Sequence, residues 1–115
     1  MSRRGDRELL SDIFEACRRI ETFVEGRSYD IFRNDIKTQD AVIRNIEIIG
    51  EAVKLLSDDF KEKHSTIEWK KIAGMRNKLI HFYFGVNLDI VWSVAKTEII
   101  ELRKKVLEIL RRESL

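Results

Sequence analysis

Hydrophobic residues recur at helical spacing along most of the chain. Between Arg7 and Glu25 they fall every three or four residues, and Gly26 follows as a residue that commonly ends a helix. We therefore expect a first helix over residues 7–25, with Cys17 as a small core residue on its stripe. The apolar positions of this stripe are Leu9, Leu10, Ile13, Phe14, Cys17, Ile20 and Val24.

Two further stretches have the same periodicity. A second helix is expected from about Thr38 to Ser57, because its apolar positions step by four and three residues like a packing seam. A fourth helix is expected after Asn87, which is a suitable N-cap, and Asp89 lies in its first turn, where the helix dipole favours negative charge. The seams are Val42, Ile46, Ile49, Val53 and Leu56, and then Trp92, Ala95, Ile99, Leu102, Val106 and Ile109.

Between these two stretches the pattern predicts a third helix, from Ser65 to about Phe82, with Ser65 and Glu68 at capping-box spacing. Its apolar residues occupy more than one face, and such a helix needs more than one partner surface. In so small a bundle we expect the second surface to be another copy of the chain, which predicts a homodimer. The apolar positions are Ile67, Trp69, Ile72, Ala73, Met75, Leu79, Ile80, Phe82, Tyr83 and Phe84.

Composition agrees with a single helical domain over residues 1–115. The chain has 115 residues with five Gly and no Pro, and it contains no repeat, linker or low-complexity segment. Short connections between four amphipathic helices predict an all-α, up-down four-helix bundle. The net charge of +2 is too small to indicate a nucleic-acid partner, so any polyanion must bind a local patch.

Several classes of protein are excluded by what the sequence lacks. No apolar run approaches the roughly 18 residues that a membrane span needs, and the charged N-terminus has no signal-peptide core. The single Cys cannot form an internal disulfide, so we expect a cytoplasmic protein with no membrane partner. We expect no cofactor and no metal site; His64, beside charged residues near a turn, is interpreted as a solvated surface residue.

The residues from Gly74 to Gly85, called the motif segment below, place several polar side chains in an apolar region. One interpretation is structural: the Arg pairs with an acid, the His caps carbonyls and the Tyr packs its ring. The other is catalytic, because Arg offers a charged fork for phosphate oxygens and His transfers protons near neutral pH. The polar residues are Arg76, Asn77, Lys78, His81 and Tyr83.

An Arg and a His can together cleave RNA without a metal. A base assists attack of the 2′-hydroxyl on the adjacent phosphate, the Arg stabilises the developing charge, and an acid protonates the leaving 5′-oxygen. On a regular helix Asn77 shares a face with His81, and Arg76 shares one with Tyr83. Arg76 and His81 lie about 140° apart on such a helix. They converge if the Arg bends across, if the helix loosens near Phe82, or if a second chain completes the site.

The motif segment resembles the HepT-like toxins, a branch of the HEPN ribonucleases whose motif is Arg-x4-His-x-Tyr. The likeness covers nearly the whole chain and extends to residues 41–52, 69–77 and 83–92. The resemblance implies a HEPN-like homodimer, a ribonuclease site at Arg76 and His81, and a toxin role. It also implies an antitoxin from the minimal nucleotidyltransferases, which in such pairs can attach AMP to the motif tyrosine, here Tyr83.

Two supporting residues and one competing function complete the interpretation. Glu51 follows Gly50 in the second helix, where the pair indicates either close helix packing or a supporting group at the site; Asn77 is the other supporting candidate. The competing function is a non-catalytic helical interaction module that binds a nucleotidyltransferase or a nucleotide. Intact Arg76 and His81 favour the metal-independent ribonuclease.

Overall fold

The apolar stripes of the sequence become long helices that pack side by side. The computed structural model describes residues 5–81 and 85–113, and for Ile80 and His81 it describes the backbone only. The elements are α1 Asp6–Val24, α2 Tyr29–Arg33, α3 Ile36–Leu55, α4 Asp58–Lys63, α5 Trp69–Ala73, α6 Met75–Leu79, β1 Ile80–His81, β2 Gly85–Val86, α7 Leu88–Ser93, the π-helical η1 Val94–Glu98 and α8 Ile99–Glu113.

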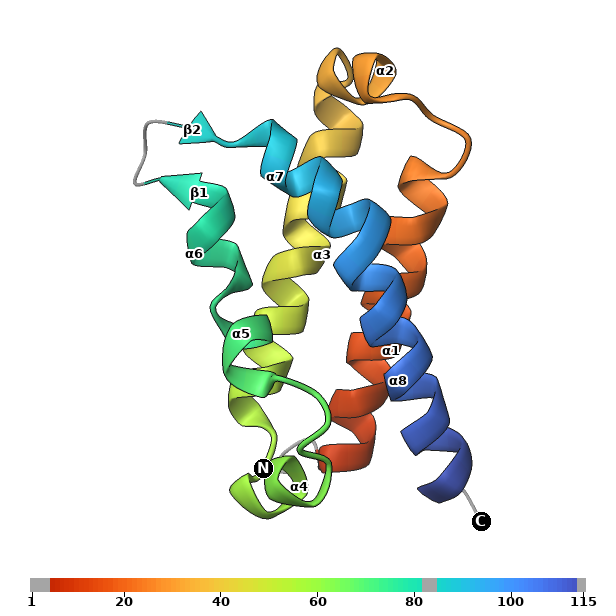
Figure 1. The fold of residues 1–115 in the computed structure, drawn as a ribbon, viewed down its shortest axis with the longest axis vertical. Helices are drawn as coiled ribbons and strands as arrows, with labels where there is room; N and C mark the ends of the chain where they lie inside the picture. The colour runs from red at the N-terminus through yellow and green to blue at the C-terminus, as the bar shows by residue number, and fades with distance from the viewer. Residues whose placement is uncertain (1–4, 82–84, 114–115) are drawn as a thin grey trace.

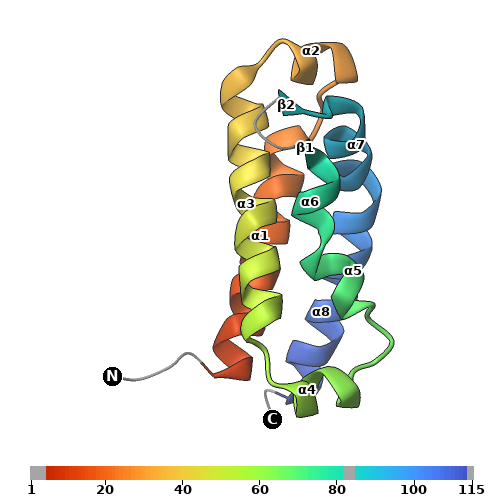
Figure 2. The ribbon, with the colours of Figure 1, turned by 90° about the vertical axis from the view of Figure 1, so that its left-hand side faces the viewer.

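Four helical segments run along the long axis in alternating directions. They are α1, α3, the broken pair α5–α6, and the continuous run α7–η1–α8 (Figures 1 and 2). The short helix α2 and the strands β1 and β2 lie at one end of the bundle, and α4 lies at the other. The predicted all-α, up-down four-helix bundle is therefore confirmed, with a two-residue antiparallel ladder added to it.

The core lies where α1 contacts α3 and α8. Cys17 belongs to it, as predicted: the side chain is completely buried, and burial, with a smaller contribution from the charge of Glu21, raises the pKa of its thiol to about 12. This keeps the thiol protonated and unreactive. Side chains with no exposed surface include Ile13, Ile20, Phe32, Val42, Ile49, Leu79, Val91, Ile99 and Val106.

The ends of the first two long helices agree with the sequence to within two residues. Gly26 follows α1 with a φ of 70°, a left-handed conformation that costs glycine little. Helix α3 begins two residues before the predicted Thr38, because Asp35 caps it by accepting the Thr38 N–H at 3.2 Å. It also ends two residues before Ser57.

The sequence analysis missed the short helices α2 and α4, which close the two ends of the bundle. Each begins after a serine that accepts a backbone N–H two residues into the helix: Ser28 from Ile31 at 3.2 Å and Ser57 from Phe60 at 3.1 Å. Ser57 also donates to Asp6 at 2.6 Å and so ties α4 to the start of α1. Helices of five and six residues are too short for periodicity to indicate.

The predicted third helix over residues 65–82 is wrong. The chain turns through Ser65, and α5 starts only at Trp69, after Glu68, which makes no side-chain cap; the predicted capping box does not form. Gly74 then separates α5 from α6, and α6 ends at Leu79, where the extended strand β1 begins. The segment is therefore two single helical turns followed by a strand.

This break also removes the argument that predicted a second surface. The large apolar side chains that the structure describes in this segment are covered within one chain, because the two short helices reach several parts of the core. The covered residues are Ile67, Trp69, Ile72, Met75 and Leu79. Phe82, Tyr83 and Phe84 lie outside the described residues. The homodimer therefore stays a prediction.

The predicted N-cap of the fourth helix is confirmed. The Asn87 side chain accepts the Ile90 N–H at 3.2 Å, and α7 starts at the next residue. What periodicity did not indicate is the π-helical turn η1, which joins α7 to α8 without interrupting the helix. The seam residues Ala95 and Ile99 are buried, as expected.

The prediction for His64 is wrong. Its Nε2 lies 2.7 Å from a Glu113 carboxylate oxygen, its ring centroid lies 4.6 Å from that of Phe60, and its side chain is only 13% exposed. Arg7 also donates to the Glu113 carbonyl at 3.2 Å, so α1, α4 and α8 are joined at this end. Among the described helices, none combines the length and hydropathy that crossing a bilayer requires.

Candidate active site

The motif segment joins a helical turn to a short hairpin. Strand β1 pairs with β2 in antiparallel register, with His81 opposite Gly85 and Ile80 opposite Val86. Gly85 has a φ of 138°, a backbone conformation that residues other than glycine rarely adopt. The Asn87 N–H donates to the Leu79 carbonyl at 2.9 Å, so the start of α7 closes the base of the hairpin.

This geometry changes how the two principal candidates are related. Arg76 lies in α6, but His81 lies in β1, so the angle of about 140° expected for a continuous helix does not apply. The predicted sharing of a helix face by Asn77 and His81 is wrong for the same reason. The expected pairing of Arg76 with Tyr83 on one face involves a residue outside the described part of the chain. The helix ends at Leu79, before His81 and earlier than the loosening near Phe82 that was one of the three alternatives. Convergence of the two side chains stays a prediction.

Arg76 is the candidate whose side chain the structure describes in full. Its Nε lies 2.8 Å from Oε2 of Glu47 in α3, in a hydrogen-bonded ion pair that joins α6 to α3. The Arg76 side chain is 49% exposed and that of Glu47 is 27% exposed. The guanidinium is therefore held at one nitrogen and remains open to solvent.

The remaining sequence candidates are placed as follows. Asn77 is exposed on α6, and Glu51 is exposed on α3, one turn beyond Glu47; neither side chain has a hydrogen bond to another described residue. For His81 the strand fixes the backbone, and Tyr83 lies outside the described residues. The structure thus brings Arg76 to an acid of α3, but that acid is Glu47 and not Glu51.

Gly50 has the packing role that the sequence suggested as one of two options. A Cβ atom at this position would lie 3.5 Å from the carbonyl oxygen of Ala73, so α3 and α5 pass close to each other here. The close approach sets α5, and through Gly74 the start of α6, against the long helix α3. A residue without a side chain thus helps to place Arg76.

Glu47 is the residue that sequence reasoning missed. It lies between Ile46, which is buried, and Ile48, which is partly buried, at the edge of the apolar stripe of α3. An acid at such an edge is normally interpreted as solvated, and its partner is distant in the sequence. The one available signal was its position four residues before Glu51, on the same face of the helix.

An aromatic cluster joins α2 to α7 at the end of the bundle that carries the hairpin. Trp92 in α7 packs against Phe32 and Tyr29 of α2, with ring centroids 5.1 and 6.0 Å away, and Lys96 lies over its ring at 5.2 Å. The Tyr29 hydroxyl donates to Asp89, and this hydrogen bond is the first cause that raises the pKa of Tyr29. The cluster holds α7, and therefore β2, in place behind the motif segment.

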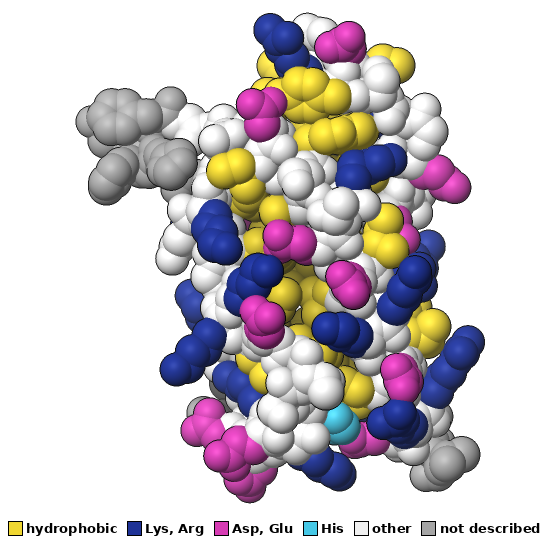
Figure 3. All heavy atoms as spheres, viewed as in Figure 1, with side chains coloured by type: hydrophobic (Ala, Val, Ile, Leu, Met, Phe, Trp, Pro, Cys, Tyr) yellow, Lys and Arg dark blue, Asp and Glu magenta, His cyan; other side chains and the backbone are white. Residues whose placement is uncertain are grey.

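On the face drawn in Figure 3, the described residues form no extended region of one charge. Lys and Arg side chains alternate there with Asp and Glu over α5 and α8. In α8, Arg112 forms an exposed ion pair with Glu108, and Arg103 forms a part-buried pair with Glu21 of α1. A polyanion would therefore be held by local contacts and not by a broad field.

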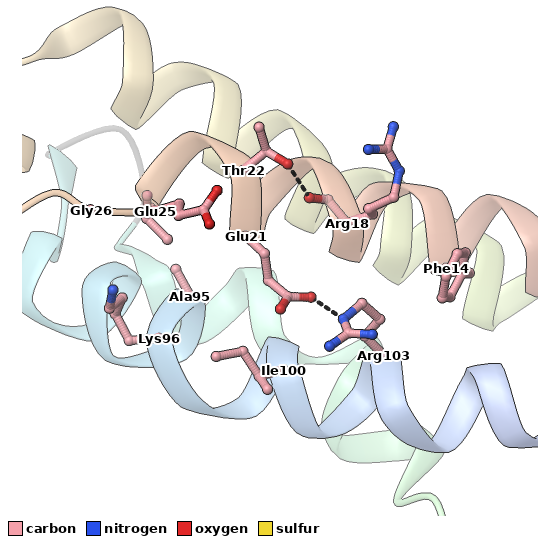
Figure 4. A pocket seen from close by; sticks show the side chains of 11 residues that line it. Phe14, Arg18, Glu21, Thr22, Glu25, Gly26, Ala95, Lys96, Ile100 and Arg103 are labelled. Carbon is pink, nitrogen blue, oxygen red and sulfur yellow. Dashed lines mark hydrogen bonds and ion pairs between the residues drawn. The ribbon is translucent and has the colours of Figure 1, made fainter.

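A hollow of about 390 Å³ lies between α1 and the η1–α8 run, away from the motif segment (Figure 4). Glu21 and Arg103 form an ion pair across it, and Phe14, Ala95 and Ile100 supply apolar lining. None of the described residues of the motif segment lines this hollow. Within residues 5–81 and 85–113, there is no group of three or more His, Cys, Asp or Glu side chains that could hold a metal ion.

Comparison with known proteins identifies the family of this chain. The family described as "Ribonuclease HepT-like" matches residues 13–109. The chain is 50% identical over 107 residues to the protein named "Putative RNase TTE0752" of Caldanaerobacter subterraneus, covering 93% of this chain and 96% of that protein. It is 46% identical over 103 residues to "Probable ribonuclease HepT" of Thermococcus cleftensis, covering 90% and 94%.

A third relative is "Putative RNase MJ0127" of Methanocaldococcus jannaschii, 41% identical over 111 residues, or 96% of this chain and 92% of that protein. No solved structure matches the chain at a significant level. The matched region contains α3, the motif segment and most of α8, which are the elements that place Arg76 and His81. The chain belongs to the HepT-like ribonuclease family.

Proposed function

We propose that this protein is a metal-independent endoribonuclease that cleaves RNA through Arg76 and His81. The observation that carries the proposal is a half-exposed Arg76 guanidinium on α6, followed directly by the strand that contains His81, in a chain of a ribonuclease family. Within six residues the segment combines an open cationic fork and a proton carrier, and phosphodiester transfer uses groups of both kinds.

The proposed reaction is an internal phosphoryl transfer. A base takes the proton of the 2′-hydroxyl, the 2′-oxygen bonds to the adjacent phosphorus, and the bond from phosphorus to the 5′-oxygen breaks. An acid gives a proton to the leaving 5′-oxygen, so the products are a 2′,3′-cyclic phosphate and a 5′-hydroxyl. Arg76 stabilises the charge that develops on the phosphate oxygens, and His81 carries protons. The nucleophile restricts the substrate to RNA.

The test compares wild type with His81→Ala, both produced without the partner antitoxin and assayed on RNA in the presence of a chelator. We expect wild type to cleave and His81→Ala to lose on the order of 10²-fold or more in rate. His64→Ala is the matched control, because it removes the other histidine of the chain, at the opposite end of the bundle. A His81→Ala protein with full activity contradicts the assignment. A wild type that binds the antitoxin but cleaves no RNA favours the interaction module.

A homodimer is the proposed assembly. Each motif supplies one histidine, whereas the reaction needs a base and an acid, so two facing motifs would give RNA a shared cleft with both groups. We propose a two-fold arrangement with the motif segments near the axis. Light scattering at micromolar concentration should report twice the mass of the 13.6 kDa chain, and a monomer would contradict the arrangement.

We further propose that the protein is the toxin of a cytoplasmic toxin–antitoxin pair and that a minimal nucleotidyltransferase silences it by adding AMP to Tyr83. The added phosphate and nucleotide would block the RNA site by charge and bulk. Intact mass spectrometry after co-expression should show AMP additions that are absent from Tyr83→Phe and retained in Tyr29→Phe, since Tyr29 is the other tyrosine. If the partner neutralises Tyr83→Phe without any adduct, occlusion by binding replaces the modification.

A further inference from the structure

Among the described residues, two arginine–glutamate pairs connect different helices of the bundle, and they differ in how far the arginine is exposed. In both pairs the arginine Nε is the donor: Arg76 to Glu47 between α6 and α3, and Arg103 to Glu21 between α8 and α1 (Figure 4). The Arg103 side chain is 25% exposed, whereas that of Arg76 is 49% exposed. The Arg76 pair is therefore the more open of the two and lies in the motif segment.

The Nε contact leaves most of the Arg76 donors available. A guanidinium has five N–H groups, of which Nε carries one and the two terminal nitrogens carry four. Among the residues that the structure describes, Glu47 is the hydrogen-bond partner of Arg76, and the terminal nitrogens have none. The edge formed by the two terminal nitrogens is the one that binds a phosphate through two parallel hydrogen bonds.

We propose that Glu47 is a positioning residue: it holds Arg76 by Nε so that the terminal edge of the guanidinium faces the scissile phosphate. This inference rests on the proposed ribonuclease function. Glu47 touches neither RNA nor the reacting atoms in this arrangement and acts through Arg76.

The location of Glu47 suits this task. It lies in the middle of α3, a helix of 20 residues packed against α1, whereas Arg76 lies in a helix of only five residues. A long half-exposed arginine on a single turn would otherwise lose much rotamer entropy when it binds phosphate. Fixing it in advance from the more rigid helix lowers that cost in the transition state.

The negative charge of Glu47 distinguishes a positioning role from simple electrostatic attraction of RNA to the site. A carboxylate beside Arg76 lowers the net positive charge at the site, so it does not improve the initial binding of RNA. Glu47 instead orients the Arg76 guanidinium, and this orientation matters most in the transition state, when charge develops on the phosphate. Loss of Glu47 should therefore lower kcat without raising KM.

The kinetic test uses the full chain with three substitutions. We expect Glu47→Ala to lower kcat by about 10-fold to 100-fold, with KM unchanged or reduced. Glu47→Gln keeps an oxygen acceptor for Nε and should retain kcat to within about threefold. Glu21→Ala breaks the other Arg–Glu pair and should leave both constants at wild-type values. In an Arg76→Ala background, Glu47→Ala should cause no further loss, because its action passes through Arg76.

A spectroscopic measurement tests the contact apart from activity. The Arg76 Nε–H signal, identified by its absence in Arg76→Lys, should exchange slowly in wild type and in Glu47→Gln and quickly in Glu47→Ala. An unchanged kcat in Glu47→Ala, a higher KM with the same kcat, or an unaltered Nε–H signal would overturn the positioning role while an active wild type still supports the ribonuclease. A wild type without RNA cleavage overturns the ribonuclease and the positioning role together.

Discussion

The long helices α1, α3 and α8 differ from the motif segment in what their sequences specify. Each long helix has 15 or more residues and carries one apolar stripe that is buried against its neighbours. The described residues of α5 and the motif segment instead form two helical turns and two short strands, although the apolar content of this region is just as high. A continuous apolar stripe therefore produces the long helices α1, α3 and α8, which are called the frame below. Where the apolar pattern is broken, polar side chains such as Arg76 are exposed at a fixed position.

The largest expected effect is on the stability of the frame. Ile49 in α3 has no exposed surface, and its replacement by Ala removes buried methyl groups and leaves a cavity. We expect Ile49→Ala to lower the free energy of unfolding by about 2–5 kcal/mol in urea titrations. Leu55 lies in the same helix with 70% exposure, and Leu55→Ala should change stability by less than about 0.5 kcal/mol. Equal losses in the two variants would contradict the assignment of the frame.

The second prediction separates activity from stability in the motif segment. Arg76→Lys keeps a positive charge but loses the fork, so we expect RNA cleavage to fall on the order of 10²-fold. The unfolding midpoint should change little, because a half-exposed ion pair contributes at most about 1 kcal/mol. Cleavage rates and circular dichroism melts on the same preparation measure both quantities. Wild-type cleavage by Arg76→Lys would mean that charge alone is enough.

The third prediction concerns Asn87, which connects the hairpin of the motif segment to α7. Asn87 caps α7 through its side chain and closes the hairpin through its backbone N–H. Asn87→Ala should lower the free energy of unfolding by about 1 kcal/mol, while Asn87→Asp keeps the acceptor and should preserve stability. Thermal melts of the three proteins measure this difference. If Ala and Asp behave alike, the side chain does not cap α7.

The smallest effect is a pH dependence at the start of α3. Hydrogen bonds from the Thr38 hydroxyl and backbone N–H, and then Arg27, lower the pKa of Asp35 below 3.8. The unfolded chain binds this proton more readily, so the stabilisation is present above about pH 4 and is lost as the pH falls through the folded-state pKa. In Asp35→Asn, stability should fall less steeply than in wild type between about pH 5 and pH 2. Parallel curves would exclude Asp35 as a contributor.

Periodicity predicted the long helices because burial decides the apolar positions along them: Ile13, Ile49 and Val106, one from each seam, have no exposed surface. It failed over residues 65–82 because apolar residues on several sides fit a continuous helix and a broken one equally well. Gly74 was the residue that marked the break. The family motif indicated Arg76 and His81, but not Glu47, since a contact across 29 positions of sequence leaves no local pattern.

The π-helical turn η1 has a consequence for the whole end of the molecule. Such a turn holds one residue more than an α-helical turn, so it shifts the rotational phase of α7 against that of α8. Removing one residue from positions 94–98 would restore the regular phase and turn α7 by about 100° about the shared axis. Asn87 and Trp92 would then no longer face the hairpin and α2. The number of residues in this helix, as much as their identity, sets the direction in which β2 meets the strand that carries His81.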